Sequence, residues 1–376
     1  MQITFILPGT EMHGGIKSTF EIANRLIERG NQVRIVYPII PIRNGASRFS
    51  ARRYASRVLG LIANIKSGNA VKWFDVRAEL VRVPTLNERF IPPADIIVAT
   101  WWANAYDVSN YAGDKGRKFY FIRAYETFGG PPDKVEGSYA LPMTRLTVST
   151  WLKEFIEDRF CVPTLGPFPN AIDFDTFRSQ RADFGAHDPL RVGMLYRRIP
   201  LTGMSEGFDA FKKVRRRFPG TRLVLFGDEP SNSDWQKIRQ LGAVEHHLLP
   251  HGRALAEIYN SLDIFVFPSH IEGFGNPPME AMACGAACIA TRVGGVPDYS
   301  IPGRTAMVVP PRDVGELTGA LMELAANEQL RRKIAVAGHE HVQSLTWDKT
   351  VERLDRLFME TVGDRDARTS PYRSGS

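Results

Sequence analysis

The segment DIFVFPSHIEGFGNPPMEAMACG, residues 263–285, carries three structural signals in one short stretch. Its first seven residues, 263–269, form an apolar run rich in β-favouring residues, which is typical of a buried strand. Asn276 and Pro277 suit an N-cap and a first helical residue, and Gly285 suits the position after a helix. The segment therefore predicts a strand, a glycine-rich loop and a helix, which together are the repeating unit of a parallel α/β sheet.

The same unit recurs along the chain in two series. β-like runs lie at 2–8, 31–37, 94–100, 117–122 and 145–149, and again at 190–195, 221–227, 243–249, 263–269, 288–291 and 307–310. Helix-period stretches separate most of these runs, and unbroken apolar strands indicate parallel sheets that are covered on both faces. Two such series predict two Rossmann-like, doubly wound domains facing a central cleft, with ligands at the carboxyl ends of the strands.

The predicted domains span residues 1–180 and 188–345. The linker is expected near 175–189, where the sequence is polar and interrupted by glycine and proline. A helix is expected over 346–362, followed by a polar, flexible tail over 363–376.

Composition narrows the class of protein. The chain has 376 residues, of which 43% are hydrophobic and 24% charged, as in ordinary globular enzymes. We find no apolar run long enough to cross a bilayer and no signal-peptide pattern at the N-terminus. Three cysteines are too few and too scattered for a disulfide framework. These observations lead us to expect a cytoplasmic protein.

The net charge of +7 favours an anionic partner. Residues 47–66 combine an apolar stripe at helical spacing with arginines on the other face. Two interpretations stay open: the stripe packs on the first domain with a solvated basic face, or the arginines make a peripheral contact with anionic membrane. Nucleic-acid binding is not expected, because no recognition motif is present.

The loop at 272–276 has the features of an anion site. Gly273 and Gly275 carry no side chains, so the backbone N–H groups and the positive end of the following helix are open to a ligand. Glu272 lies in this loop and Glu280 in the predicted first turn of the helix. Because they cannot share a helical face, we expect them to contact different parts of one ligand. A nucleotide-sugar offers such parts: a diphosphate, a sugar and a ribose.

Five motifs resemble those of one family, and they occur along the chain in the same order as in that family. The segment 272–280 (EGFGNPPME) resembles the E-x7-E signature of retaining GT-B glycosyltransferases, specifically family 4. The other matches are Gly14-Gly15 to the first glycine loop, residues 170–173 to N-G-I-D, residues 192–196 to the strand before the diphosphate loop, and residues 346–348 to the start of the C-terminal helix. The resemblance extends over most of the chain. It implies a GT-B fold whose last helix crosses back to the first domain, and transfer with retention of anomeric configuration.

The resemblance also assigns roles on the donor side. It implies that Glu280 holds the ribose and that Glu272 contacts the donor sugar as a catalytic residue. The base is expected to be read by backbone near Gly227 and Leu249. The other residues expected to bind the donor are Gly14, Gly15, Gly193, Thr202, Gly273, Phe274, Gly275 and Asn276.

The chain departs from the family pattern in the loop after residues 192–196. Thr202 stands where the family has a lysine, which removes a charge expected on the diphosphate. Arg197 or Arg198 can compensate, and the sequence does not choose between them. No metal-binding carboxylate pair follows a strand. We therefore expect metal-independent stabilisation of the leaving group by helix dipole, loop amides and arginine, with no cofactor.

The acceptor side is expected in the first domain. Trp101 and Trp102 stand where the family often has a histidine, and aromatic faces suit sugar stacking. One of these tryptophans can equally be a buried structural residue, and His13 can be an ordinary loop histidine. The full set expected to bind the acceptor is His13, Trp101, Trp102, Arg123, Tyr125 and Glu126.

The sequence thus predicts a retaining glycosyltransferase of surface polysaccharide biosynthesis. It would move a hexose or deoxyhexose from a UDP-, dTDP- or GDP-sugar to a glycan or lipid-linked acceptor. The alternatives are a GT-B epimerase or phosphorylase, or an inactive nucleotide-sugar-binding relative, which the missing lysine at Thr202 leaves open. A nicotinamide-dependent dehydrogenase is not expected, because no G-x-G-x-x-G follows a first strand.

Overall fold

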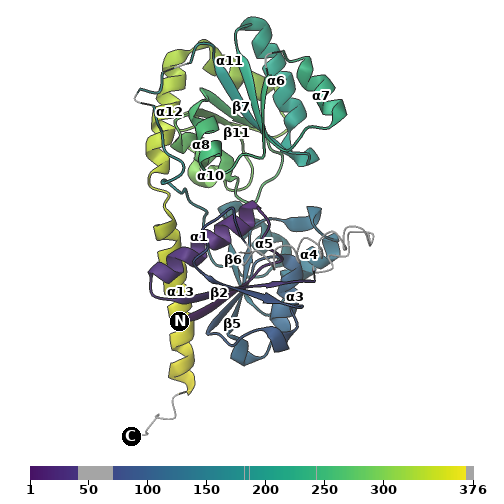
Figure 1. The fold of residues 1–376 in the computed structure, drawn as a ribbon, viewed down its shortest axis with the longest axis vertical. Helices are drawn as coiled ribbons and strands as arrows, with labels where there is room; N and C mark the ends of the chain where they lie inside the picture. The colour runs from purple at the N-terminus through teal and green to yellow at the C-terminus, as the bar shows by residue number, and fades with distance from the viewer. Residues whose placement is uncertain (41–70, 182, 186, 243, 370–376) are drawn as a thin grey trace. The chain divides into compact units, whose positions relative to one another are not determined.

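A computed structural model describes residues 1–40, 71–181, 183–185, 187–242 and 244–369. Internal contacts divide the chain into two compact units (Figure 1). Unit 1 comprises Met1–Pro169 and Trp347–Ser376, and unit 2 comprises Asn170–Thr346. The division therefore follows Pro169 rather than residue 180, and the segment predicted as a linker belongs to unit 2. The amphipathic segment 47–66 falls outside the described residues.

Unit 1 is built on a six-stranded sheet in the order β3-β2-β1-β4-β5-β6. Its strands run parallel, with Ile3 of β1 opposite Val33 of β2 on one side and Ile96 of β4 on the other. The chain switches direction between β1 and β4, as doubly wound folds do. The strands are β1 (Gln2–Ile6), β2 (Gln32–Pro38), β3 (Glu79–Val83), β4 (Ile96–Ala99), β5 (Arg117–Ile122) and β6 (Thr144–Thr147).

The sequence pattern did not reveal β3. This strand lies at the edge of the sheet, most of its residues are only half-buried, and its sequence ELVRV carries two charges. A short edge strand of this kind lacks the apolar run that marks the central strands.

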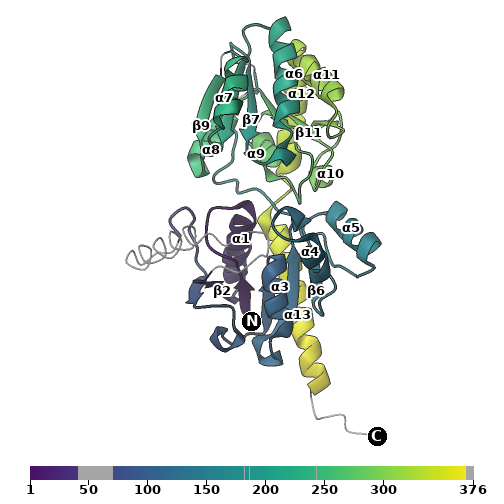
Figure 2. The ribbon, with the colours of Figure 1, turned by 90° about the vertical axis from the view of Figure 1, so that its right-hand side faces the viewer.

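Helices cover both faces of the unit 1 sheet (Figure 2). α1 packs beside α13 on one face, and α3 packs beside α4 on the other. The helices are α1 (Gly14–Glu28), α3 (Trp102–Asn110), α4 (Pro132–Ser138), α5 (Thr150–Phe160) and α13 (Trp347–Thr369), with 3-10 turns η1 (Glu88–Phe90), η2 (Gly113–Lys115) and η3 (Glu126–Phe128).

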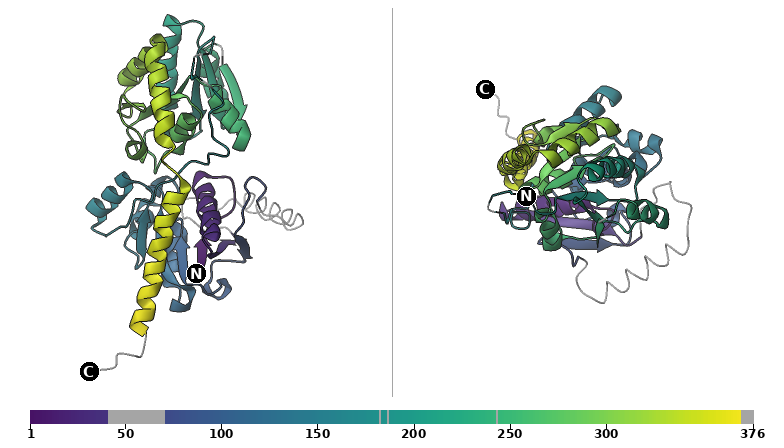
Figure 3. Two further views of the ribbon diagram at one scale, coloured as in Figure 1. Left: turned by 90° about the vertical axis from the view of Figure 1, so that its left-hand side faces the viewer. Right: turned by 90° about the horizontal axis from the view of Figure 1, so that it is seen from above.

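A buried carboxylate fastens α13 to the end of α1. Asp355 accepts hydrogen bonds from Arg29 Nε at 2.9 Å and from Asn31 Nδ2 at 2.8 Å. Phe358, one turn along, packs its ring edge against Phe119 of β5, with centroids 4.9 Å apart. The last helix of the chain is therefore part of the first unit, where it runs along the sheet beside α1 (Figure 3).

Unit 2 has a second six-stranded parallel sheet, in the order β12-β11-β10-β7-β8-β9. Its strands are β7 (Arg191–Tyr196), β8 (Arg222–Gly227), β9 (Val244–Leu248), β10 (Ile264–Phe267), β11 (Ala287–Thr291) and β12 (Met307–Val309). Its helices are η4 (Pro200–Thr202), α6 (Met204–Arg217), α7 (Asn232–Arg239), α8 (Gly252–Asn260), α9 (Asn276–Ala283), α10 (Val296–Tyr299), α11 (Val314–Ala326) and α12 (Glu328–Val342). β10 lies inside the sheet and is buried throughout, so the loop that follows it is held on a rigid support.

The segment predicted as a linker is anchored by Asp263, which stands just before β10. Its buried carboxylate accepts from the backbone N–H of Arg191 at 2.8 Å and of His187 at 2.9 Å, and from Arg181 Nη2 at 3.3 Å. A buried charge is stable only when it is well paired, and here one carboxylate gathers several donors. These hydrogen bonds fix the chain segment that leads into β7.

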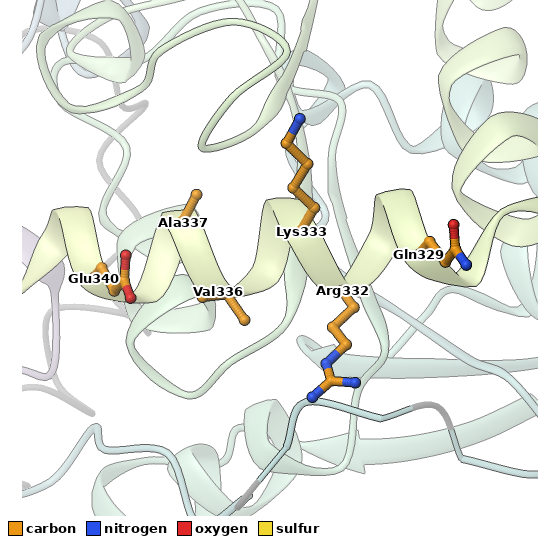
Figure 4. Close-up of a pocket in the computed structure, with 6 residues that line it drawn as sticks. All are labelled: Gln329, Arg332, Lys333, Val336, Ala337 and Glu340. Atoms are coloured by element: carbon orange, nitrogen blue, oxygen red, sulfur yellow. The ribbon is translucent and has the colours of Figure 1, made fainter.

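A pocket of about 450 Å³ lies along α12 (Figure 4). It is lined by Gln329, Arg332, Lys333, Val336, Ala337 and Glu340. Figure 4 shows Lys333 and Arg332 pointing away from each other, so the charged groups do not converge on one point. None of the predicted site residues lines this pocket. Among the described residues, no helix has both the length and the apolar character that crossing a bilayer requires.

Candidate functional site

The loop after β10 turns into α9 through a left-handed glycine. Gly275 is the N-cap of α9 with φ +87°, and Asn276 is the first helical residue. The prediction of Asn276 as N-cap was therefore wrong by one position, because the cap adopts a backbone conformation that favours glycine. Asn276 Oδ1 instead accepts a hydrogen bond from Asn170 Nδ2 at 2.9 Å. Glu280 consequently lies beyond the first turn, which contains no acidic residue.

Glu272 is half-buried and held by its neighbours. Its Oε1 accepts a hydrogen bond from Ser269 Oγ at 2.7 Å. Burial raises the pKa of Glu272, while the Ser269 hydrogen bond and the positive charge of Arg197 act in the opposite direction. A carboxyl group whose pKa is shifted by burial and by a nearby charge, at the carboxyl end of a central strand, is a candidate catalytic group.

A pair of glycines after β11 fixes this loop. A Cβ on Gly294 would lie 2.7 Å from the carbonyl oxygen of Glu272, and a Cβ on Gly295 would overlap the ring of Phe274. Gly295 N donates to Phe274 O at 3.0 Å, and Tyr299 Oη donates to Gly275 O at 2.6 Å. Sequence reasoning missed Gly294, Gly295 and Tyr299, although the Gly-Gly pair directly after a strand was a usable signal.

Glu280 is positioned by a buried tyrosine from α8. Tyr259 Oη donates to Glu280 Oε2 at 3.2 Å. Burial, with the charge of Glu280 as a further cause, holds the pKa of Tyr259 well above its usual value, so the hydroxyl remains a donor. Glu280 and Glu272 thus have separate partners. This fits the expectation that they contact different parts of one ligand. The sequence did not identify Tyr259, because its pairing with Glu280 depends on how α8 packs against α9.

The two arginines after β7 differ in their surroundings. The backbone N–H of Arg198 donates to Asp228 Oδ2 at 2.9 Å, and its Nε donates to the carbonyl of Glu229 at 2.5 Å. Arg197 is exposed, and its charge acts on Glu272. Thr202 Oγ1 donates to the carbonyl of Ile199 at 2.9 Å within the same loop. Arg198 is therefore hydrogen-bonded to the β8 loop, whereas the positive charge of Arg197 acts to lower the pKa of Glu272.

The remaining donor-side residues divide into two kinds. Gly193 lies in the middle of β7, where a Cβ would overlap Leu262, so close packing accounts for this glycine and it does not reach the loops. Gly227 ends β8 with φ +125°, and its carbonyl accepts from Leu249 N at 2.7 Å. Leu249 is 50% exposed and has φ +43°. Gly227 and Leu249 are thus neighbours at the carboxyl end of the sheet.

In unit 1, the β1–α1 loop and the end of β5 come together. His13 is the N-cap of α1, with Nδ1 accepting from Gly15 N at 3.3 Å, and the helix starts at Gly14. A Cβ on Gly15 would lie 3.5 Å from Cδ of Arg123. Arg123 Nη2 donates to Thr19 Oγ1 at 3.2 Å, so the arginine runs along the first turn of α1.

Two of the predicted acceptor residues that follow β4 and β5, Trp102 and Arg123, act on the carboxyl group of a third, Glu126. Glu126 Oε2 accepts from the backbone N–H of Trp102 at 3.1 Å. Burial raises the pKa of Glu126 to about 8, opposed by that hydrogen bond and by Arg123. Trp102 is only 4% exposed and Trp101 is half-buried, so Trp102 is the structural residue of the pair. Tyr125 Oη donates to Glu136 Oε1 at 2.5 Å.

Among the described residues, no group of three or more His, Cys, Asp or Glu side chains lies close enough to hold a metal ion. Both cysteines of the C-x3-C spacing, Cys284 and Cys288, are buried and unpaired.

Comparison with known proteins assigns unit 2. Residues 188–327 match the family described as "Glycosyl transferases group 1". The matched segment contains the β10–α9 loop, both arginines and both glutamates described above. The chain therefore contains a domain of the transferase class.

Full-length relatives agree with this assignment. The chain is 29% identical to a GDP-mannose-dependent alpha-(1-6)-phosphatidylinositol monomannoside mannosyltransferase of Mycolicibacterium smegmatis, over 59% of this chain and 63% of the relative. It is also 29% identical to a D-inositol 3-phosphate glycosyltransferase of Saccharomonospora viridis, over 54% of this chain and 50% of the relative. The matches thus span only about half to two thirds of those relatives' lengths.

The fold is GT-B, as expected. The structure of Anabaena Alr3699/HepE in complex with UDP-glucose superimposes with a TM-score of 0.70 at 15% identity, covering 97% of this chain and 100% of that chain. Both six-stranded sheets of the present chain are doubly wound, as the resemblance implied.

We predict that Gly294→Ala displaces the Glu272 loop. Alanine is strained at φ +55°, and its Cβ would press on the Glu272 carbonyl, so the free energy of unfolding should fall by about 2 kcal/mol or more. The thermal midpoint measures the effect. Gly319→Ala in α11 is the matched control, since open space surrounds Gly319 and alanine favours helix. Equal midpoints for the two variants would contradict the proposed constraint.

We predict that Glu126 makes unit 1 less stable as pH rises. Its folded pKa of about 8 lies above the ordinary glutamate value of 4.5, so the folded state retains a proton that the unfolded state has lost. The contribution of Glu126 to the free energy of unfolding is largest below about pH 4.5 and is lost as pH rises to about 8. Glu126→Gln, which stays neutral, should gain in thermal midpoint relative to wild type between pH 5 and pH 9. The exposed Glu154→Gln should show no such gain, and parallel pH profiles for wild type and Glu126→Gln would refute the assignment.

Proposed function

We propose that this protein is a retaining glycosyltransferase of family 4 that transfers a hexose or deoxyhexose from a nucleoside diphosphate sugar. The observation that carries the proposal is the β10–α9 loop. There a half-buried carboxyl, Glu272, is fixed by Gly294 beside the N-terminus of α9, within the group 1 domain. A helix N-terminus after a glycine loop suits a diphosphate.

Donor binding is proposed to use both glutamates. Glu280, held by Tyr259, receives the ribose hydroxyls, and Glu272 receives the sugar. The amides at 273–276 and the α9 dipole contact the diphosphate. Phe274 is buried, so it contributes backbone only. Support for a nucleotide-sugar comes from the GDP-mannose named for the mycolicibacterial relative and the UDP-glucose in the Anabaena structure.

The proposed reaction breaks the bond between the anomeric carbon and the diphosphate oxygen and forms a bond to an acceptor hydroxyl, which loses its proton. Negative charge then develops on the leaving diphosphate. We propose that Arg197 and the α9 dipole stabilise it without a metal ion or cofactor. Arg197 rather than Arg198 replaces the missing lysine, because the Nε of Arg198 is committed to Glu229.

The acceptor is proposed to be a glycan or lipid-linked saccharide of polysaccharide or glycolipid biosynthesis, bound by unit 1. Glycolipid names among the relatives support this class. Trp101 and Tyr125 are half-buried and can stack on a sugar. We further propose a cytoplasmic enzyme in peripheral contact with anionic membrane, consistent with its net charge of +7.

We predict that one nucleoside diphosphate among UDP, GDP, dTDP and CDP raises the thermal midpoint, with and without Mg²⁺. A ligand at ~100 times its dissociation constant, binding only the folded state, adds about 2.7 kcal/mol of stability. NAD is the negative control. A shift that requires Mg²⁺ would disprove metal independence. The absence of any shift would favour an inactive relative in which Thr202 has cost the site its affinity.

We predict that Glu272→Gln lowers the rate of sugar transfer by about 10²–10³, because it removes a charge beside the reacting centre while keeping the shape of the side chain. Turnover with the donor identified above is the measurement. Glu257→Gln, an exposed change on α8, should keep the wild-type rate. Full activity in Glu272→Gln would remove this residue from the catalytic centre.

A further inference from the structure

Arg123 carries buried hydrogen-bond donors that the protein itself does not use. It stands directly after β5, and its Nε and Nη1 atoms are shielded from solvent and have no hydrogen-bond partner. Only Nη2 is bonded, to Thr19 Oγ1 at 3.2 Å. The guanidinium carbon lies 4.4 Å from the centroid of the Phe121 ring, which covers one face of the group.

This arrangement is costly for a structural arginine. A buried donor without a partner typically loses about 1–3 kcal/mol, and more when the group is charged. Among the described residues, Arg123 forms no ion pair, although Glu126 is near enough to influence its pKa. Burial lowers the pKa of Arg123 only to about 10, so the guanidinium remains charged at neutral pH. Groups held at such cost are characteristic of binding sites.

The charge of Arg123 is not cancelled locally. The pKa of Glu126 is raised to about 8, so this carboxyl is mostly neutral at pH 7. The other groups coupled to Glu126 are Tyr120 and Tyr139, whose pKa values are raised by burial, so they too are neutral. The neighbouring titratable groups named here therefore leave the charge of Arg123 largely uncompensated at pH 7.

Two further features near Arg123 favour an anion. The Arg123 side chain lies against Gly15, and its guanidinium bonds Thr19, near the start of α1, a 15-residue helix whose N-terminus has a positive dipole end. Gly14 at that end has open space where a side chain would be. Trp102, which binds the same Glu126 through its backbone, has a buried Nε1 without a partner. Arg123 and Trp102, which follow two neighbouring strands, thus each carry buried donors that have no partner among the described residues.

We propose that Arg123 and the first turn of α1 bind a phosphate group carried by the acceptor. Arginine and helix N-termini are both suited to phosphate oxygens, and a phosphate has several oxygens to satisfy several donors. The proposal rests on the proposed function, since it names the chemistry of the acceptor. The phosphate belongs either to a membrane lipid or to a soluble phosphorylated saccharide.

The test uses sn-glycerol 3-phosphate as the probe and glycerol as its neutral match, with the full chain at pH 7. The nucleoside diphosphate that gives the largest thermal shift is present at saturation throughout, so that the donor-side anion site is filled. Glycerol phosphate should raise the thermal midpoint of wild type, whereas glycerol should not. Arg123→Gln should weaken the apparent affinity at least about tenfold, the loss expected for a charge-assisted hydrogen bond.

Two other variants act as controls. Arg159→Gln removes an exposed arginine of the same unit and should respond to glycerol phosphate like wild type. Arg123→Lys keeps the charge and should respond weakly, which guards against a folding defect in Arg123→Gln. Circular dichroism and the midpoint without ligand check that each variant is folded. An unchanged response in both Arg123 variants would overturn the proposal, as would an equal loss in Arg159→Gln.

Further arms identify the source of the phosphate. If a membrane lipid carries the phosphate, Arg123→Gln should reduce sedimentation with phosphatidylglycerol vesicles relative to phosphatidylcholine vesicles. If Arg123→Gln reduces only the thermal response to glycerol phosphate and leaves sedimentation unchanged, the acceptor is soluble. If Arg123→Gln loses the nucleoside diphosphate shift instead, the group bound is the donor diphosphate and the proposal is wrong. If no nucleoside diphosphate binds wild type but the Arg123-dependent response persists, the proposed function fails while the phosphate site stands.

Discussion

The close contact between the loop after β10 and the glycine pair after β11 is the constraint on which the candidate site depends. Gly294 lets the backbone of Glu272 approach, and Gly295 leaves room for the ring of Phe274. With Tyr299 holding the carbonyl of Gly275, the loop enters α9 through one left-handed residue. The backbone of Glu272 and the N-terminus of α9 are thereby fixed relative to each other. Preorganisation of this kind avoids the cost of ordering groups during a reaction.

Electrostatics then separates residues that look alike in the sequence. Arg197 and Arg198 are adjacent, yet the charge of Arg197 acts to lower the pKa of Glu272, whereas Arg198 hydrogen-bonds to Asp228 and Glu229. Glu272 is stabilised by Ser269, whereas Glu280 is held by Tyr259 from another helix. In the candidate site of unit 2, Arg198, Glu272 and Glu280 thus each have a different partner. Such division of environments allows similar side chains to take different roles.

The first unit shows the complementary situation, in which charges are buried without full pairing. Arg123 and Glu126 influence each other's pKa, and both are perturbed mainly by burial. The carboxyl ends of β1, β4 and β5 contribute to this cluster, because parallel strands deliver their following loops to one edge of a sheet. Polar groups left without partners in such a place have a cost in stability, and ligand binding is the physical reason that best accounts for it.

The sequence by itself determined the two series of strands and helices, the loop between Glu272 and Glu280 and the type of the second domain, because hydrophobic period, glycine and proline act over a few neighbouring residues. It did not reveal β3, whose half-buried edge position leaves no apolar run, and it placed the α9 cap on Asn276 instead of Gly275. Only the tertiary structure decided that Asp263 orders the segment before β7, that Gly294 fixes Glu272 and that Tyr259 holds Glu280. It also showed that the charge of Arg197 influences the pKa of Glu272. Each of these contacts joins residues distant in the chain, and their proximity is set by how the strands and helices pack, which no local pattern encodes.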